Sequence, residues 1–182
     1  MERDSARLAV AIIAVLTVSM LGPSPILQID SSNEYRETVK NSSCIICINE
    51  LMPNADGSDQ GIFPQGEWVE LLNTGSSSVN LEGWTIVDIG GWTHPINQSS
   101  WVGFANLATP YHLEPGAYAV IAENEIGTLR LNNAGETVFL KDSQDIVVHE
   151  ITTGQAANGV SKIPSGSNGE WLDSDQPTPG AE

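Results

Sequence analysis

The sequence predicts an all-β protein, an antiparallel β-sandwich preceded by an N-terminal hydrophobic helix. Its 182 residues are enough for a single domain with one buried core. With 17 Gly and 10 Pro but only 16% charged residues, the composition suits short strands joined by many turns better than a helical bundle. After residue 43 no stretch keeps apolar residues at helical spacing, and short β-rich runs end in turn residues instead. Such strands bury their apolar faces most simply by forming two facing sheets.

Residues 1–27 are expected to act as a signal peptide or as an uncleaved signal anchor. Arg3 and Arg7 precede an uncharged apolar run over residues 8–22, which is the layout of a secretory signal. A helix over this run would be about 22 Å long, shorter than the roughly 30 Å hydrocarbon core unless it continues to residue 27. Few small residues suit cleavage, so removal of this segment and its retention as an anchor both stay open. Because the two arginines should remain in the cytoplasm, we expect the rest of the chain outside the cell.

Residues 28–43 are polar and without periodicity, which is typical of a linker between the N-terminal segment and the folded domain. Asn41 and Asn97 each begin an Asn-x-Ser sequence, the acceptor pattern for N-glycosylation. We therefore treat both as candidate modification sites.

The folded domain is expected to span residues 44–182 and to contain about seven strands. The run over 44–52 is apolar on both faces, which favours a central strand. Pro115-Gly116 predicts a type II turn, because Pro fixes φ and Gly accepts the positive φ that follows. The expected strands are 44–52, 67–72, 84–88, 117–122, 129–131, 136–140 and 146–151.

Residues 89–112 form a connection too long for a hairpin and rich in aromatic residues. Loops of this length are usually functional or disordered, and the aromatic residues argue against disorder. Trp92, Trp101 and Tyr111 are the candidates for a binding surface, because aromatic side chains often anchor recognition sites. The alternative is that the loop packs onto its own sandwich.

Glu70 shares a strand face with Trp68 and Leu72, so alternation could turn its carboxylate toward the interior. A buried carboxylate needs hydrogen-bond donors or a cation, and we expect a structural role such as binding backbone N–H groups. Glu67 is three residues away and should face the other side, so the two do not form an opposed catalytic pair.

Cys44 and Cys47 are the only cysteines and have C-x-x-C spacing. They could remain buried or free thiols, or form a disulfide at the entry of the first strand. A zinc site would need a second Cys or His pair at suitable spacing, and a redox site would need a helix N-terminus that lowers the thiol pKa. The sequence offers neither, so metal and redox roles are disfavoured.

Several segments together resemble the lamin-tail domain family, in its prokaryotic exported type. The matching segments lie in the same order as in the family. They are 48–54 (INELMPN), 66–73 (GEWVELLN), 79–84 (VNLEGW), 113–116 (LEPG), 133–138 (NAGETV) and 177–181 (PTPGA). The resemblance implies an immunoglobulin-like β-sandwich that acts as an interaction module and carries no catalytic residues of its own. Lys162 stands where the family often has Arg before Pro, and the 89–112 connection is longer than usual.

These observations predict a noncatalytic extracellular binding or surface-assembly module, secreted or tethered to the membrane through its N-terminal segment. The formal net charge of −16 makes nucleic-acid binding unfavourable, so the expected partner is a protein or a surface glycan. We expect no catalytic residues, no cofactor and no metal site, because the three histidines are scattered and none accompanies a nucleophile. The alternatives are an accessory subunit of, or itself, an extracellular enzyme that degrades phosphoesters or nucleic acids, and a structural envelope component.

Overall fold

The computed structural model describes residues 44–97, 100–102, 111–122, 129–165 and 169–180. All of them belong to one compact unit that spans Ser31–Glu182. The expected signal segment, the linker and Asn41 lie outside the described residues. Every regular element in the described part is a β-strand, and this part contains no helix suited to crossing a membrane.

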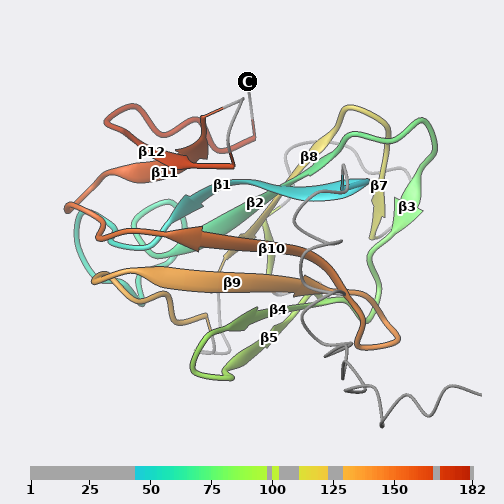
Figure 1. Ribbon diagram of the computed structural model, residues 1–182, viewed down its shortest axis with the longest axis horizontal. Helices are drawn as coiled ribbons and strands as arrows, with labels where there is room; N and C mark the ends of the chain where they lie inside the picture. The colour runs from blue at the N-terminus through green and yellow to red at the C-terminus, as the bar shows by residue number, and fades with distance from the viewer. Residues whose placement is uncertain (1–43, 98–99, 103–110, 123–128, 166–168, 181–182) are drawn as a thin grey trace, which may run out of the picture. The chain divides into compact units, whose positions relative to one another are not determined.

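The strands form two main antiparallel sheets and one short strand pair (Figure 1). The larger sheet has the order β12-β11-β1-β2-β8-β6, and the smaller has the order β10-β9-β4-β5. The larger sheet contains β12 (Trp171–Ser174), β11 (Ser161–Pro164), β1 (Ile46–Met52), β2 (Trp68–Asn73), β8 (Tyr118–Ala122) and β6 (Trp101–Val102). The smaller contains β10 (Val147–Thr153), β9 (Glu136–Lys141), β4 (Thr85–Asp88) and β5 (Thr93–Pro95). β3 (Val79–Asn80) pairs with β7 (His112–Leu113).

The two sheets share one apolar core, which confirms the predicted β-sandwich. Apolar residues on one face of the central strands enter this core, as expected for strands with one buried face. Each fully buried Leu, Ile or Val side chain stabilises the fold by roughly 1.5–3 kcal/mol relative to exposure. The larger sheet contributes Ile48, Leu51, Val69, Leu71 and Ile121 among others, and the smaller contributes Ile86, Val138, Leu140 and Ile151.

β1 lies inside the larger sheet, between β11 and β2, as its apolar sequence predicts. The pairing of β1 with β2 shifts register between Ile48 and Glu50, so Asn49 is the extra residue of a β-bulge. At this bulge the Ile48 amide donates a hydrogen bond of 3.0 Å to Nδ1 of His149 on β10. A side chain of the smaller sheet thus satisfies a backbone group of the larger sheet.

The predicted turn at Pro115-Gly116 is confirmed. Gly116 has a φ of 73°, and the Ala117 amide donates to the Glu114 carbonyl at 3.0 Å, as a type II turn requires. The turn leads directly into β8.

Two sequence-based expectations about the strands were wrong. Residues 129–131 form no strand, although Leu129 and Leu131 are buried, because the Leu131 amide donates to the Glu67 carboxylate at 2.9 Å and not to a sheet ladder. The 89–112 connection is not one continuous loop, since its described residues include β5, β6 and the first residue of β7. Residues 98–99 and 103–110 lie outside the described part.

His94 should make the fold sensitive to acid. Its side chain on β5 is 2% exposed. Desolvation by burial lowers its pKa to about 4, although a hydrogen bond with the Ala122 backbone acts in the opposite direction. The folded state therefore keeps the ring neutral, whereas the unfolded chain takes up a proton near pH 6.5. The His94 contribution to the free energy of unfolding should fall by about 3 kcal/mol as the pH drops from 6.5 to about 4.

Urea unfolding over this pH range, for the unaltered chain and for His94→Gln, measures the effect. The variant retains His149, whose pKa burial also lowers, so the difference between the two curves reports His94 alone. The unaltered chain should lose more stability on acidification than the variant. Parallel curves would contradict the assignment.

Candidate functional site

The turn that joins β4 to β5 projects from the smaller sheet and is held by its own hydrogen bonds. The Asp88 carboxylate accepts a hydrogen bond from the Trp92 amide at 2.7 Å. The Asp88 amide also donates to the Trp92 carbonyl at 3.1 Å, and the Gly91 amide donates to the Asp88 carbonyl at 3.0 Å. Gly91 has a φ of 84°, which favours glycine at this position. We call residues 88–92 the hairpin tip.

The hairpin tip exposes two large apolar side chains. Ile89 is 67% exposed and Trp92 is 55% exposed. The Arg130 guanidinium lies over the Trp92 ring, with 4.7 Å between Cζ and the ring centroid. A cation–π contact of this kind is worth about 0.5–1 kcal/mol at an exposed site. It favours one orientation of the indole and places a cation beside an apolar surface.

A buried carboxylate anchors the hairpin tip to the body of the domain. Glu136, at the start of β9, is 3% exposed. Its Oε1 accepts hydrogen bonds from the Ile89 amide at 3.2 Å and the Thr137 amide at 2.7 Å. Its Oε2 accepts one from the Asn132 amide at 2.8 Å, two residues after Arg130. One side chain therefore fixes both segments that meet at the Trp92–Arg130 contact.

The structure places the three expected aromatic residues in three separate parts of the fold. Trp92 belongs to the hairpin tip. Trp101 begins β6 at the edge of the larger sheet, and its side chain lies outside the described part. Tyr111 directly precedes β7, with a φ of 63°, and its carbonyl accepts the Leu81 amide at 2.9 Å. Of the three, Trp92 has the best-defined exposed surface.

The structure joins Cys44 and Cys47 in a disulfide, one of the states that their spacing leaves open. Their Cα atoms are 5.3 Å apart, at the entry to β1. The Thr74 hydroxyl donates to the Cys44 carbonyl at 2.6 Å, and the Thr74 amide donates to the Ile45 carbonyl at 2.8 Å. The disulfide therefore lies at the start of β1, next to the last residue of β2.

Asn97, the candidate glycosylation residue in the described part, participates in a local turn. Its amide donates to the Ser100 hydroxyl at 2.9 Å, and its side-chain oxygen accepts the Ser100 amide at 3.1 Å. The side chain thus has a structural contact at this position.

Glu70 is fully buried and binds N–H groups, as expected, but on the face of β2 opposite to Val69 and Leu71, which enter the main core. Its Oε1 accepts from Asn49 Nδ2 at 2.8 Å, and its Oε2 accepts from the Gly180 amide. Burial raises the pKa of Glu70, and neighbouring Glu50 adds to this rise, whereas the hydrogen bonds from Gly180 and Asn49 oppose it. Glu67 faces the other side of the strand, where its Oε2 accepts the Leu131 amide.

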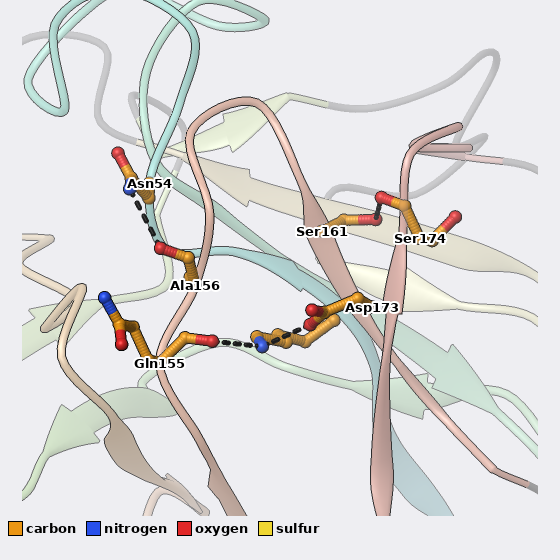
Figure 2. A network of polar contacts seen from close by, with 7 residues as sticks. Asn54, Gln155, Ala156, Ser161, Asp173 and Ser174 are labelled. Atoms are coloured by element: carbon orange, nitrogen blue, oxygen red, sulfur yellow. Dashed lines mark hydrogen bonds and ion pairs between the residues drawn. The ribbon is translucent and has the colours of Figure 1, made fainter.

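A second buried polar network lies where β11 meets β12. Lys162 is 4% exposed, and its ammonium group contacts the Asp173 carboxylate and donates to the Gln155 carbonyl at 2.6 Å (Figure 2). The Asn54 side chain donates to the neighbouring Ala156 carbonyl at 3.0 Å. The burial of Lys162 could not be inferred from its strand alone, because its partner Asp173 comes from a strand that the residue pattern does not predict.

The described residues contain no group of three or more His, Cys, Asp or Glu side chains placed to hold a metal ion. His94, His112 and His149 belong to three different strands, β5, β7 and β10.

Sequence reasoning missed Ile89 of the hairpin tip and the two residues that contact the tip, Arg130 and Glu136. No local signal pairs Arg130 with Trp92, since they are far apart in the chain. Asp88 before Gly90-Gly91 is the one sequence signal for the hydrogen-bonded turn, because an Asp side chain often accepts a backbone N–H a few residues later.

Comparison with known proteins gives one match. A family model described as Lamin Tail Domain matches residues 40–155, which is well over half of the chain. Neither the curated proteins nor the solved structures gave a significant match. The larger sheet extends beyond the matched residues, because β11 pairs with β1 and β12 pairs with β11.

Replacing Asp88 with Ala should loosen the hairpin tip. Trp92 loses its carboxylate acceptor, so its amide should exchange with solvent about tenfold faster, which corresponds to about 1.4 kcal/mol. Amide hydrogen exchange followed by NMR measures this rate. Asp142→Ala is the matched control, since Asp142 accepts the Gln144 and Ile146 amides in the turn between β9 and β10. An unchanged Trp92 rate in Asp88→Ala would show that the carboxylate does not hold the tip.

Proposed function

Because the chain belongs to the lamin tail domain family, we propose that it is a noncatalytic binding or surface-assembly module that works outside the cell. The family has an immunoglobulin-like fold without catalytic chemistry. In this function the hairpin tip binds the partner, and residues 1–27 direct export of the chain.

The observation that carries the binding role is the exposed, preorganised pair of Trp92 and Arg130. Aromatic and Arg side chains are the commonest binding hot spots, and a rigid surface loses little entropy on association. The hydrogen bonds of Asp88 and Glu136 hold the tip before any partner arrives. An indole with an adjacent guanidinium suits a sugar ring with nearby acceptors, or an apolar side chain next to a carboxylate.

The acidic character of the chain limits the kind of partner. With 23 Asp and Glu against 7 Lys and Arg, the molecule repels polyanions, which disfavours nucleic acids. A protein or a surface glycan is the partner class that remains consistent with both the charge and the hairpin tip.

A partner that docks on the hairpin tip should depend on Trp92. Immobilised chain is tested in separate arms against purified surface polysaccharides and against exported proteins of the same cells. Trp92→Ala should weaken binding at least about tenfold, as expected for a hot spot. Leu172→Ala removes a comparably exposed side chain on β12 and should change binding less than about twofold. Equal binding by the unaltered chain and Trp92→Ala would remove the tip as the contact surface.

The export proposal rests on Arg3, Arg7 and the apolar run over residues 8–22. Cell fractionation of the full chain should place it in the membrane or in the medium. Replacing both arginines and inserting charged residues into the run should keep the protein in the cytosol, because the signal layout is lost. Cytosolic location of the unaltered chain would contradict export, and turnover of phosphoester substrates by the purified chain would contradict the noncatalytic role.

A further inference from the structure

The outer face of the larger sheet carries two buried carboxylates side by side. Glu50 on β1 pairs directly with Glu70 on β2. Their neighbours Leu51, Val69 and Leu71 enter the main core, so both glutamates face away from it. They are nevertheless 1% and 0% exposed. Something other than the second sheet must therefore cover them.

The C-terminal segment, residues 176–180, contacts both carboxylates on this face. The Thr178 amide lies 3.3 Å from Oε1 and 3.2 Å from Oε2 of Glu50, and the Thr178 hydroxyl donates to Oε2 at 3.1 Å. The Gly180 amide donates to Glu70 Oε2. Prolines at 177 and 179 have no N–H group. The segment thus presents N–H groups at alternate positions, and each meets one carboxylate.

Hydrogen bonds, and not burial of apolar side chains, attach the segment to the sheet. None of residues 175–180 is fully buried, and Thr178 itself is exposed, so the segment adds little to an apolar core. The contacts that hold it are hydrogen bonds to carboxylates, which are about twice as strong as neutral ones. Alternating prolines also restrict the free segment, which reduces the entropy lost when it docks.

The body of the domain also donates a hydrogen bond to each of the two carboxylates. Ser161 on β11, seen beside Ser174 in Figure 2, donates its hydroxyl to Glu50 Oε1 at 2.5 Å. Asn49, the bulged residue of β1, donates to Glu70 Oε1 at 2.8 Å. Among the described residues no lysine, arginine or histidine forms an ion pair with either glutamate. Oε2 of each carboxylate accepts hydrogen bonds from the segment, from Thr178 in Glu50 and from Gly180 in Glu70.

We propose that Glu50 and Glu70 form a peptide-binding site, and that its ligand is the chain's own segment 176–180, docked on a body that folds without it. The ligand class is an extended peptide of the Pro-Thr-Pro-Gly type that offers two alternate N–H groups. This site lies on the opposite sheet from the hairpin tip and is independent of the proposed binding role of Trp92.

The test separates the site from its ligand. A chain that ends at Ser174 keeps β11 and β12, and a synthetic peptide of residues 175–182 supplies the segment. The shortened chain should retain its β-sheet circular-dichroism spectrum and bind the peptide in isothermal titration calorimetry. A peptide with N-methylglycine at position 180 lacks the N–H that meets Glu70 and should bind at least about tenfold more weakly. A peptide with Ala at position 175 is the control and should bind equally.

A second test changes the protein and leaves the peptide unaltered, with Glu70→Gln in the shortened chain. Asn49 and Gly180 bind different oxygens of Glu70, and Gln replaces one of these oxygens with an NH2 donor, so one hydrogen bond is lost and binding should fall at least about tenfold. Glu114→Gln, an exposed position on the turn before β8, should bind as the unaltered chain does. A shortened chain that is unfolded, or that is folded and fails to bind the peptide, overturns the proposal.

Amide exchange in the full chain gives a second measurement that does not depend on truncation. The Thr178 and Gly180 amides should exchange through a local opening, at least about a hundredfold faster than the core amides of β1 and β2. Exchange of these two amides only together with the core would show that the segment is part of the cooperative fold, and would also overturn the proposal.

Discussion

The hydrogen bond from a main-chain N–H to a buried glutamate recurs throughout this domain, and the placement of its loops depends on it. Glu50, Glu67, Glu70 and Glu136 are all at most 3% exposed. Each accepts an N–H from a segment outside the two main ladders: Thr178, Leu131, Gly180, and the pair Ile89 and Asn132, respectively. A buried carboxylate without such donors would cost several kcal/mol. Sheet and loops therefore stabilise each other.

This arrangement links the fold to the candidate binding surface. Leu131 and Asn132, which follow Arg130, donate to Glu67 and Glu136, while Ile89 of the hairpin tip also donates to Glu136. The segments that carry Trp92 and Arg130 are thus set by hydrogen bonds to the body of the domain. A surface positioned in this way can present an aromatic ring to a partner without ordering it first.

Much of the sandwich follows from local patterns, because a strand with one buried face leaves a period of two in the sequence. The runs that became β1, β2, β4, β8, β9 and β10 were predicted within about two residues of their observed bounds. The turn at Gly116 and the burial of Glu70 followed from local residues, although Glu70 is buried on the strand face that points away from the main core.

The remaining features depend on contacts between distant segments, which no local pattern encodes. Leu129 and Leu131 alternate like a strand, yet the Leu131 amide pairs with Glu67 and not with a ladder. β11 and β12 are short and rich in polar residues, and β11 is defined by pairing with β1, which lies more than a hundred residues earlier. The contact of Arg130 with Trp92 arises in the same way. The family resemblance anticipated the immunoglobulin-like fold but did not identify these pairs.

Amide hydrogen exchange of Ile89, Leu131 and Asn132 in the unaltered chain tests the role of the buried glutamates most directly. None of the three amides belongs to a strand, so without a fixed acceptor each would exchange at nearly the rate of an unstructured peptide. If the Glu67 and Glu136 carboxylates hold them, all three should be protected by at least about a hundredfold. Unprotected exchange at these positions, with the strands intact, would contradict the account.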